Sequence, residues 1–157
     1  MNAAGGLEFA RGLVEAHYAG RWWQLEQGAY RAIAIEGAAT VAVLGPKIGN
    51  NPDPFLSLAC GVAKAVPHSA ALHELVNAEN KETFFGSTYI EPGANGTASV
   101  ISQLLIPLEP VAWEAQASIQ WAAKAVNSVI ARADLAAQRI PGERFGRGDA
   151  YILWMLT

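Results

Sequence analysis

The sequence has little cysteine and little charge. Cys60 is the only cysteine among 157 residues, so no disulfide can form within the chain, and a cytoplasmic protein is favoured over a secreted one. Charged side chains make up 16% of the residues, against about 25% in a typical soluble domain. The net charge of −3 argues against a nucleic-acid partner, because nucleic-acid-binding surfaces are strongly basic.

Long apolar segments are also missing. No run approaches the roughly 20 apolar residues that a membrane-spanning helix needs. The first residues carry Glu8, Arg11 and Glu15 in a helical pattern, which differs from the apolar core of a signal peptide. We therefore expect neither a membrane partner nor a secretory leader.

The residue types that carry catalysis or bind metals form no recognisable pattern. His68 and His73 are five positions apart, about 140° around a helix, so they are predicted not to share a face. Glu79 and Glu82 end a predicted helix, and we expect both in solvent. Cys60 is in phase with neighbouring apolar residues, which indicates a buried thiol and not a nucleophile. The sequence predicts a non-enzymatic protein without a metal or cofactor.

Apolar residues are abundant enough for a folded core. They make up 52% of the chain, which includes 30 alanines, and the mean hydropathy is +0.16. A chain of this length can bury a sizeable core. We expect one domain over residues 1–141, followed at 142–157 by a glycine-containing connection and an apolar tail that docks on the domain or on a second subunit.

Hydrophobic periodicity predicts an α+β fold. Helical periodicity covers residues 7–18, 69–81 and 110–139. Alternating periodicity predicts about three strands within 21–66 and two more at 84–90 and 97–106. The order α-β-β-β-α-β-β-α predicts a five-stranded antiparallel sheet with helices against one side and a long last helix.

Two details of the first strands follow from the same patterns. Leu56, Leu58, Cys60 and Val62 recur at every second position, which predicts a strand with one buried face. The pair Gly45-Pro46 is typical of a loop, because proline cannot donate to a ladder of hydrogen bonds.

One segment links this order of elements to a known family. The run Leu75-Val76-Asn77-Ala78-Glu79-Asn80, the following Phe84-Phe85-Gly86 and the link Leu105-Ile106-Pro107-Leu108 resemble the type III secretion chaperone-like fold. They are most similar to its YbjN-type bacterial branch of sensory-transduction-regulator-like proteins. The resemblance implies a short helix that ends in an asparagine-bearing turn before the fourth strand. It also implies a binding or chaperone-like module, often dimeric, without a cofactor.

Aromatic and apolar side chains exceed what one core needs. Trp22 and Trp23 are neighbours, so in a strand they point to opposite faces. The last helix is apolar on two sides, with Trp113, Trp121 and Leu135 opposite the face expected on the sheet. The tail at 151–156 is expected to pack against Trp113 and Trp121 of the same chain or of a second subunit, or to add a strand to a sheet edge. The candidate partner-binding residues are Trp22, Trp23, Trp113, Trp121, Leu135, Tyr151 and Trp154.

These observations favour a binding function. The first hypothesis is a chaperone-like, protein-binding module with an unidentified client, which forms a homodimer through the second face of its last helix. The alternative is a small-ligand-binding or sensory domain that uses the hollow between sheet and helices.

Overall fold

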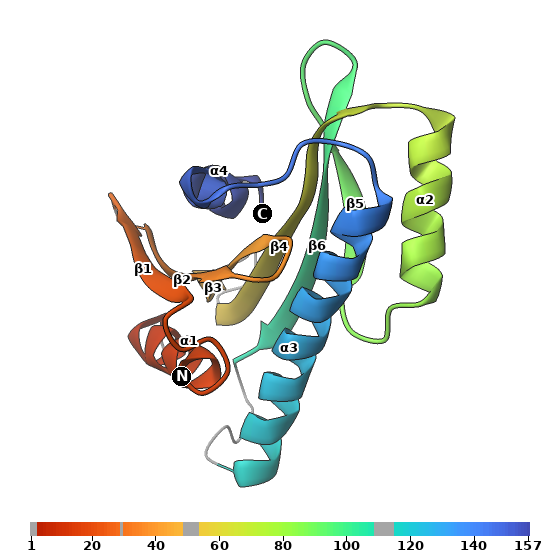
Figure 1. Ribbon diagram of the computed structural model, residues 1–157. Coiled ribbons are helices and arrows are strands. Elements are labelled where there is room, and N and C mark those ends of the chain that lie inside the picture. Colours follow the sequence, from red (N-terminus) through yellow and green to blue (C-terminus); the bar gives the residue numbers. More distant parts are fainter. Residues whose placement is uncertain (1–2, 29, 49–53, 109–114) are drawn as a thin grey trace.

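The computed structural model describes residues 3–28, 30–48, 54–108 and 115–157, which form one antiparallel sheet and the helices around it (Figure 1). The helices are α1 (Ala3–Glu15), α2 (Ala70–Lys81), α3 (Gln116–Arg139) and α4 (Ala150–Leu156), with a short 3-10 helix, η1 (Arg147–Asp149), before α4. The strands are β1 (Trp22–Gln27), β2 (Tyr30–Glu36), β3 (Val41–Ile48), β4 (Pro54–Pro67), β5 (Ser87–Pro92) and β6 (Thr97–Pro107).

Across the described residues the sheet has six strands, in the order β1-β2-β3-β4-β6-β5. The α+β class and the antiparallel sheet are confirmed, but the prediction of five strands is wrong. The strand that was missed is β1, which pairs with β2 from Trp22 opposite Ile35 to Gln27 opposite Tyr30. It lies at the sheet edge and its later residues are polar and mostly exposed, so its sequence lacks the alternation of a half-buried strand.

Helices cover both faces of the sheet, not one face as predicted. On the first face, alternate residues of β2, β3, β4 and β6 pack with α1, α2 and α3 in the larger of two cores. On the second face, the remaining alternate residues pack with α4 and with Phe145. In Figure 1, α3 and α4 lie on opposite sides of the central strands. Residues 56–63 of β4 are therefore buried on both faces, and the prediction of one buried face there is wrong.

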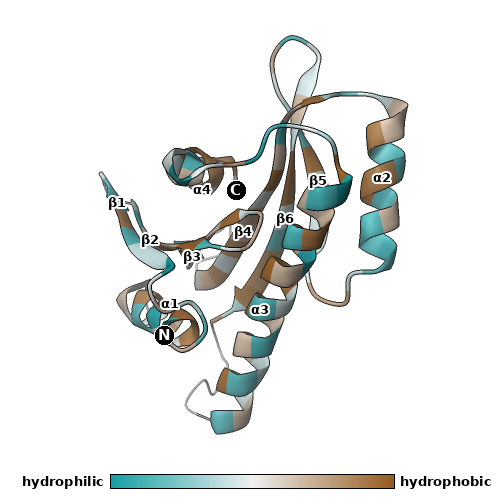
Figure 2. Ribbon diagram, in the orientation of Figure 1, coloured by the Kyte–Doolittle hydropathy of each residue, from teal (hydrophilic) through white to brown (hydrophobic). Residues whose placement is uncertain are grey.

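The long helix α3 packs closely against the sheet. Its buried residues are mostly small and recur at helical spacing: Ala122, Ala125, Val126, Val129, Ile130, Ala133 and Ala136. Trp121 and Leu135 lie outside this buried face and are exposed, as the sequence predicted. Figure 2 shows the corresponding apolar colour along β3, β4 and β6, in contrast to the hydrophilic β1. Trp113 lies outside the described residues.

The apolar tail forms α4 and docks on the second face of the sheet. Leu153 and Trp154 are buried there with Val43 and Ala59. The tail therefore does not pack against Trp121, which is on α3. Gly45 lies within β3 and not in a loop, and a Cβ there would come within 2.9 Å of the Ala32 Cβ and 3.2 Å of the Trp154 ring. Glycine at this position is what allows the ring to approach the strand.

The described helices include none that is both long and apolar enough to cross a membrane.

Candidate functional site

An exposed apolar patch lies where the turn between α2 and β5 meets the outer side of α3. The Phe84 side chain is 96% exposed, and Trp121 and Leu135 on α3 are 46% and 44% exposed. Phe85 is half-buried, and its ring lies edge-to-face with Trp121 at 6.0 Å between centroids. We call these four side chains the Phe84 patch. Apolar surface in water costs about 25 cal/mol per Å², so a cluster of this kind is typical of a binding surface.

The local backbone explains why Phe84 projects outward. The helix α2 ends at Lys81, and the Thr83 hydroxyl donates to the Glu79 carbonyl at 2.7 Å. Gly86 has a φ of +71°, and a Cβ there would lie 2.2 Å from the Gln103 carbonyl oxygen. Only glycine fits so close to the neighbouring strand in this conformation. The turn that carries Phe84 and Phe85 is therefore fixed at both ends.

A shallow hollow lies within the patch. It has a volume of about 210 Å³ and is open to solvent. Phe84, Phe85 and Leu135 line its apolar part, and Ser128 and Ala131 of α3 line the remainder with the charged residues beside them. The small side chains of α3 leave this space, which is large enough for one side chain of a partner.

Two acidic and two basic residues form the rim of the patch. The Arg132 guanidinium lies 2.9 Å from a Glu79 carboxylate oxygen and also binds Glu82. Arg139 lies 3.4 Å from the other Glu79 oxygen. The hydrogen bond and the charge of Arg132 lower the pKa of Glu82. Glu79 is only 4% exposed, so the prediction that it lies in solvent is wrong: Arg132 and Arg139 reach it from α3.

Asn80 shields the outer edge of β5 beside the patch. Its side-chain amide donates to the Thr88 carbonyl at 2.9 Å and accepts from the Thr88 N–H at 2.7 Å. The amide thus takes the place of a neighbouring strand at this residue. The Asn80 side chain therefore satisfies both backbone groups of Thr88.

The other candidate residues are dispersed. Trp22 and Trp23 are both half-buried on opposite faces of the sheet, and the Arg147 guanidinium lies 4.2 Å from the Trp23 ring centroid. Tyr151 is half-buried with its ring edge-on to Tyr30, and Trp154 is 2% exposed. Of the described candidates, Trp121 and Leu135 alone belong to the Phe84 patch.

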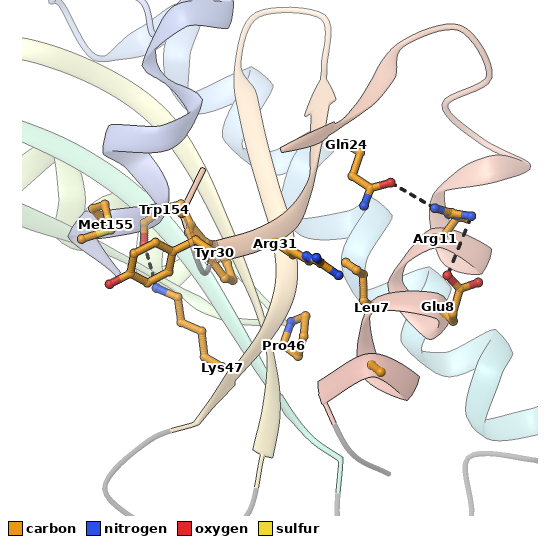
Figure 3. Close-up of a pocket in the computed structure, with 12 residues that line it drawn as sticks. Leu7, Glu8, Arg11, Gln24, Tyr30, Arg31, Pro46, Lys47, Trp154 and Met155 are labelled. Carbon is orange, nitrogen blue, oxygen red and sulfur yellow. Dashed lines mark hydrogen bonds and ion pairs between the residues drawn. The ribbon is translucent and has the colours of Figure 1, made fainter. Parts of the chain in front are cut away.

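A second hollow, the edge pocket, opens at the end of the β1–β2 hairpin (Figure 3). Its volume is about 940 Å³. Arg31 and Pro46 point to the side of α1, whereas Tyr30 and Lys47 point to the side of α4, because neighbouring residues of a strand alternate between faces. The pocket therefore bends around the edge of the sheet, with residues of α1 on one side and of α4 on the other. Its lining residues are Ala4, Leu7, Glu8, Arg11, Gln24, Gly28, Tyr30, Arg31, Pro46, Lys47, Trp154 and Met155.

Lys47 is the lining residue that joins this pocket to the C-terminal end of α4. Burial lowers its pKa from 10.5 to about 8. Its ammonium donates to the Trp154 carbonyl and the Thr157 hydroxyl, each at 2.8 Å, and lies 4.1 Å from the Trp154 ring centroid. These contacts hold the C-terminal end of α4 on β3.

The cysteine and histidine predictions have different outcomes. Cys60 is fully buried, and burial raises the pKa of its thiol, which confirms a structural residue.

His68 and His73 do contact each other, with 3.1 Å between their Nε2 atoms, so the prediction that they diverge is wrong. The helix begins only at Ala70, so the 100° spacing does not apply to His68. The sequence does indicate this helix start, because Ser69 is a favoured N-cap residue and a run with helical apolar periodicity follows it.

Comparison with known proteins identifies the fold. No protein-family model and no curated protein matches the sequence. The solved structure of YbjN, a proposed transcription regulator from E. coli, has a TM-score of 0.56 and 11% sequence identity, and the match covers 86% of this chain and 94% of that chain. This similarity supports a YbjN-like fold, as the resemblance implied.

Proposed function

We propose that the chain is a non-enzymatic, protein-binding regulatory module with a chaperone-like fold, and that the Phe84 patch binds a second copy of the chain. The single observation that carries this proposal is the Phe84 ring, which is 96% exposed within a cluster of apolar side chains. The fold neighbour is described as a proposed transcription regulator, which agrees with a protein that acts by binding. The client implied by the sequence resemblance stays a prediction without an assigned surface.

The charges at the rim suit a two-fold partner. In an isologous dimer the same patch meets itself in the opposite direction, so it must be self-complementary. The patch carries Glu82 and Arg139 at its rim, which pair with each other at 3.5 Å and whose side chains are 60% and 53% exposed. A two-fold arrangement can bring this exposed pair next to the same pair of the second copy, with each charge facing its opposite. Aromatic side chains are the usual anchors at the centre of such an interface.

Sedimentation at micromolar concentration tests this proposal. The unmodified chain should sediment as a dimer of its 16.6 kDa monomer, and Phe84→Ser should sediment as a monomer. Leu105→Ser is the matched control, because Leu105 is 52% exposed on the opposite face of the sheet, and this variant should remain a dimer. A monomeric unmodified chain contradicts the proposal.

One observation favours a second candidate function, the binding of a small amphiphilic anion in the edge pocket. Three of the eleven basic residues line this pocket, with Glu8 as the one acidic lining residue among those described. Arg31 forms no ion pair within the described ranges, and it points towards Leu7 (Figure 3). An anionic group on Arg31 and Arg11 with an apolar chain along Leu7 and Pro46 fits this lining.

Calorimetric titration distinguishes this second function. Octanoate should bind, octanol should bind more weakly, and Arg31→Gln should abolish the difference between them. Arg144→Gln removes the same charge at an exposed site outside the pocket lining and should leave the affinities for octanoate and octanol unchanged. Equal binding of octanoate and octanol to the unmodified chain contradicts an anion site.

A further inference from the structure

Two of the three histidines meet at the N-terminal end of α2, the end opposite the Phe84 patch. The Nε2 atoms of His68 and His73 are 3.1 Å apart, and the ring centroids are 5.2 Å apart with 31° between the ring planes. Both side chains are exposed. Neither the proposed dimer nor the edge pocket uses this pair.

The start of α2 fixes the positions of both rings. Ser69 caps the helix by accepting the Leu72 N–H at 3.3 Å, so His68 precedes the cap and His73 is the fourth helical residue. These two positions face each other in helices with a side-chain staple across the cap, usually an apolar pair. The backbone N–H of His68 donates to the Gly96 carbonyl at 2.9 Å, which holds this residue on the β5–β6 hairpin. The pair is thus held by two separate elements.

We propose that His68 and His73 bind one divalent transition-metal ion through their Nε2 atoms, with the other coordination positions open to water or to a group from another molecule. Imidazole nitrogens suit zinc, copper and nickel, and metal–nitrogen bonds are about 2.0–2.1 Å long. With the nitrogens 3.1 Å apart, an ion at that distance from both makes a nitrogen–metal–nitrogen angle of about 95–100°. This angle lies between those of square-planar and tetrahedral sites.

The pair is well arranged for a metal before the metal arrives. In the absence of an ion, one Nε2–H must donate to the other Nε2, because two lone pairs or two N–H groups at this distance repel. A bound ion accepts the Nε2 lone pairs of both rings, and the proton of the donating Nε2 moves to the Nδ1 of the same ring. Two neutral rings therefore bind the ion without net release of a proton, each with its Nδ1 protonated.

Two features limit the affinity of the site. The described residues include no group of three or more histidine, cysteine, aspartate or glutamate side chains that could hold a metal ion, so His68 and His73 act as a two-ligand site. The partial positive charge of the helix N-terminus also opposes a cation. We therefore expect dissociation constants in about the micromolar range, with copper bound more tightly than zinc.

Calorimetric titration with zinc chloride, in a buffer that does not bind metals, tests the proposal. The unmodified chain should bind one equivalent, and His68→Gln and His73→Gln should each weaken binding by at least about tenfold. His17→Gln is the matched control, because His17 is exposed and its ring lies edge-on to Tyr18; it should bind as the unmodified chain does. Undiminished binding by either paired-histidine variant overturns the proposal.

A measurement on the unmodified chain removes any dependence on how the variants fold. Nitrogen-15 spectra of the imidazole rings should show zinc-induced shifts at Nε2 of His68 and His73, with Nδ1 of both rings protonated in the zinc-bound form and the His17 ring unchanged. Absence of shifts in both rings at millimolar zinc overturns the proposal. Shifts of equal size in all three histidines also overturn it, because they would indicate unselective surface binding.

Discussion

The two faces of the sheet are closed in different ways. The first face is covered by α1, α2 and α3, and 29 of the described residues are buried in its core. The second face is covered by α4 and the segment before it, and 10 of the described residues are buried in its core. The larger core depends on the summed burial of many apolar groups. The smaller core has fewer such groups and depends more on individual contacts.

These individual contacts are polar and well defined. A helix of seven residues is too short to be stable by itself. Lys64 binds the Asp149 carboxylate at 2.9 Å, and Lys64 also forms an isolated antiparallel bridge with Glu143. Lys47 binds the Trp154 carbonyl. The comparison predicts that a substitution in the first core destabilises the whole fold, whereas a substitution in the second core first detaches α4 from the sheet.

The largest expected effect is on the first face. Ile130 is 1% exposed on α3, and Ile130→Ala should lower the free energy of unfolding by about 2–5 kcal/mol, because it removes buried methyl groups and leaves a cavity. Leu153 on α4 is 0% exposed, but Leu153→Ala should cost less globally, because α4 can open locally. Urea unfolding of both variants measures this difference. An equal loss in both would show that the two faces unfold together.

A smaller effect is expected at the centre of the same face. Cys60 is fully buried on β4, and Cys60→Ser should destabilise the fold by about 1–3 kcal/mol, because the hydroxyl is buried and needs a hydrogen-bond partner. Chemical unfolding gives the value. Burial raises the pKa of the native thiol, so a thiol reagent should modify Cys60 only after unfolding. Fast modification of the native chain would contradict this burial.

On the second face, Asp149 should make the docking of α4 dependent on pH. The Gly146 N–H and then Lys64 lower its pKa. Its stabilising contribution is therefore present above the ordinary value of about 3.9 and is lost as the pH falls through the lowered pKa. Because the Lys64–Asp149 pair is partly exposed, we expect it to stabilise the docked α4 by about 0.5–1 kcal/mol. The protection of residues 150–156 against hydrogen exchange, taken relative to the intrinsic amide exchange rates, should fall in acid, and Asp149→Asn should show the lower protection already at neutral pH; unchanged protection in this variant at neutral pH contradicts the role.

The smallest effect concerns the charge of Lys47. Its pKa of about 8 means that the folded chain loses this proton at lower pH than the unfolded chain does. Through this group, stability should rise slightly as the pH increases from about 8 towards 10.5. Acetic anhydride labelling against pH, read by peptide mass spectrometry, should give a midpoint near 8 for Lys47. A midpoint near 10.5 would show that the amine is in solvent.

The sequence predicts the first face better than the second. The helix periodicity of α3 and the cap at Ser69 are local signals, and the structure confirms both helices. The edge strand β1 and the helix α4 owe their structure to neighbours distant in the sequence, and six consecutive apolar residues at 151–156 fit helix and strand equally. Tertiary contacts decide such segments, and periodicity cannot.

The candidate site was predicted in part. Trp121 and Leu135 were found, because α3 is apolar on two sides. Phe84 was assigned to a strand at 84–90, although β5 begins only at Ser87. Gly86 could have indicated that the strand begins later, because glycine is favoured at turn positions with a positive φ, which strands lack. The ion pairs of Glu79 join residues more than 50 positions apart, a separation that no local pattern encodes.

Hydrogen exchange of the unmodified chain at two concentrations tests the central claim most directly. The central claim is that the Phe84 patch binds a second copy, while both sheet faces are closed within one chain. Raising the concentration from nanomolar to high micromolar should slow exchange at residues 83–87 and along 118–135, and should leave α4 and β1 unchanged. Exchange at the patch that does not depend on concentration, or protection gained at α4 in its place, would contradict the account.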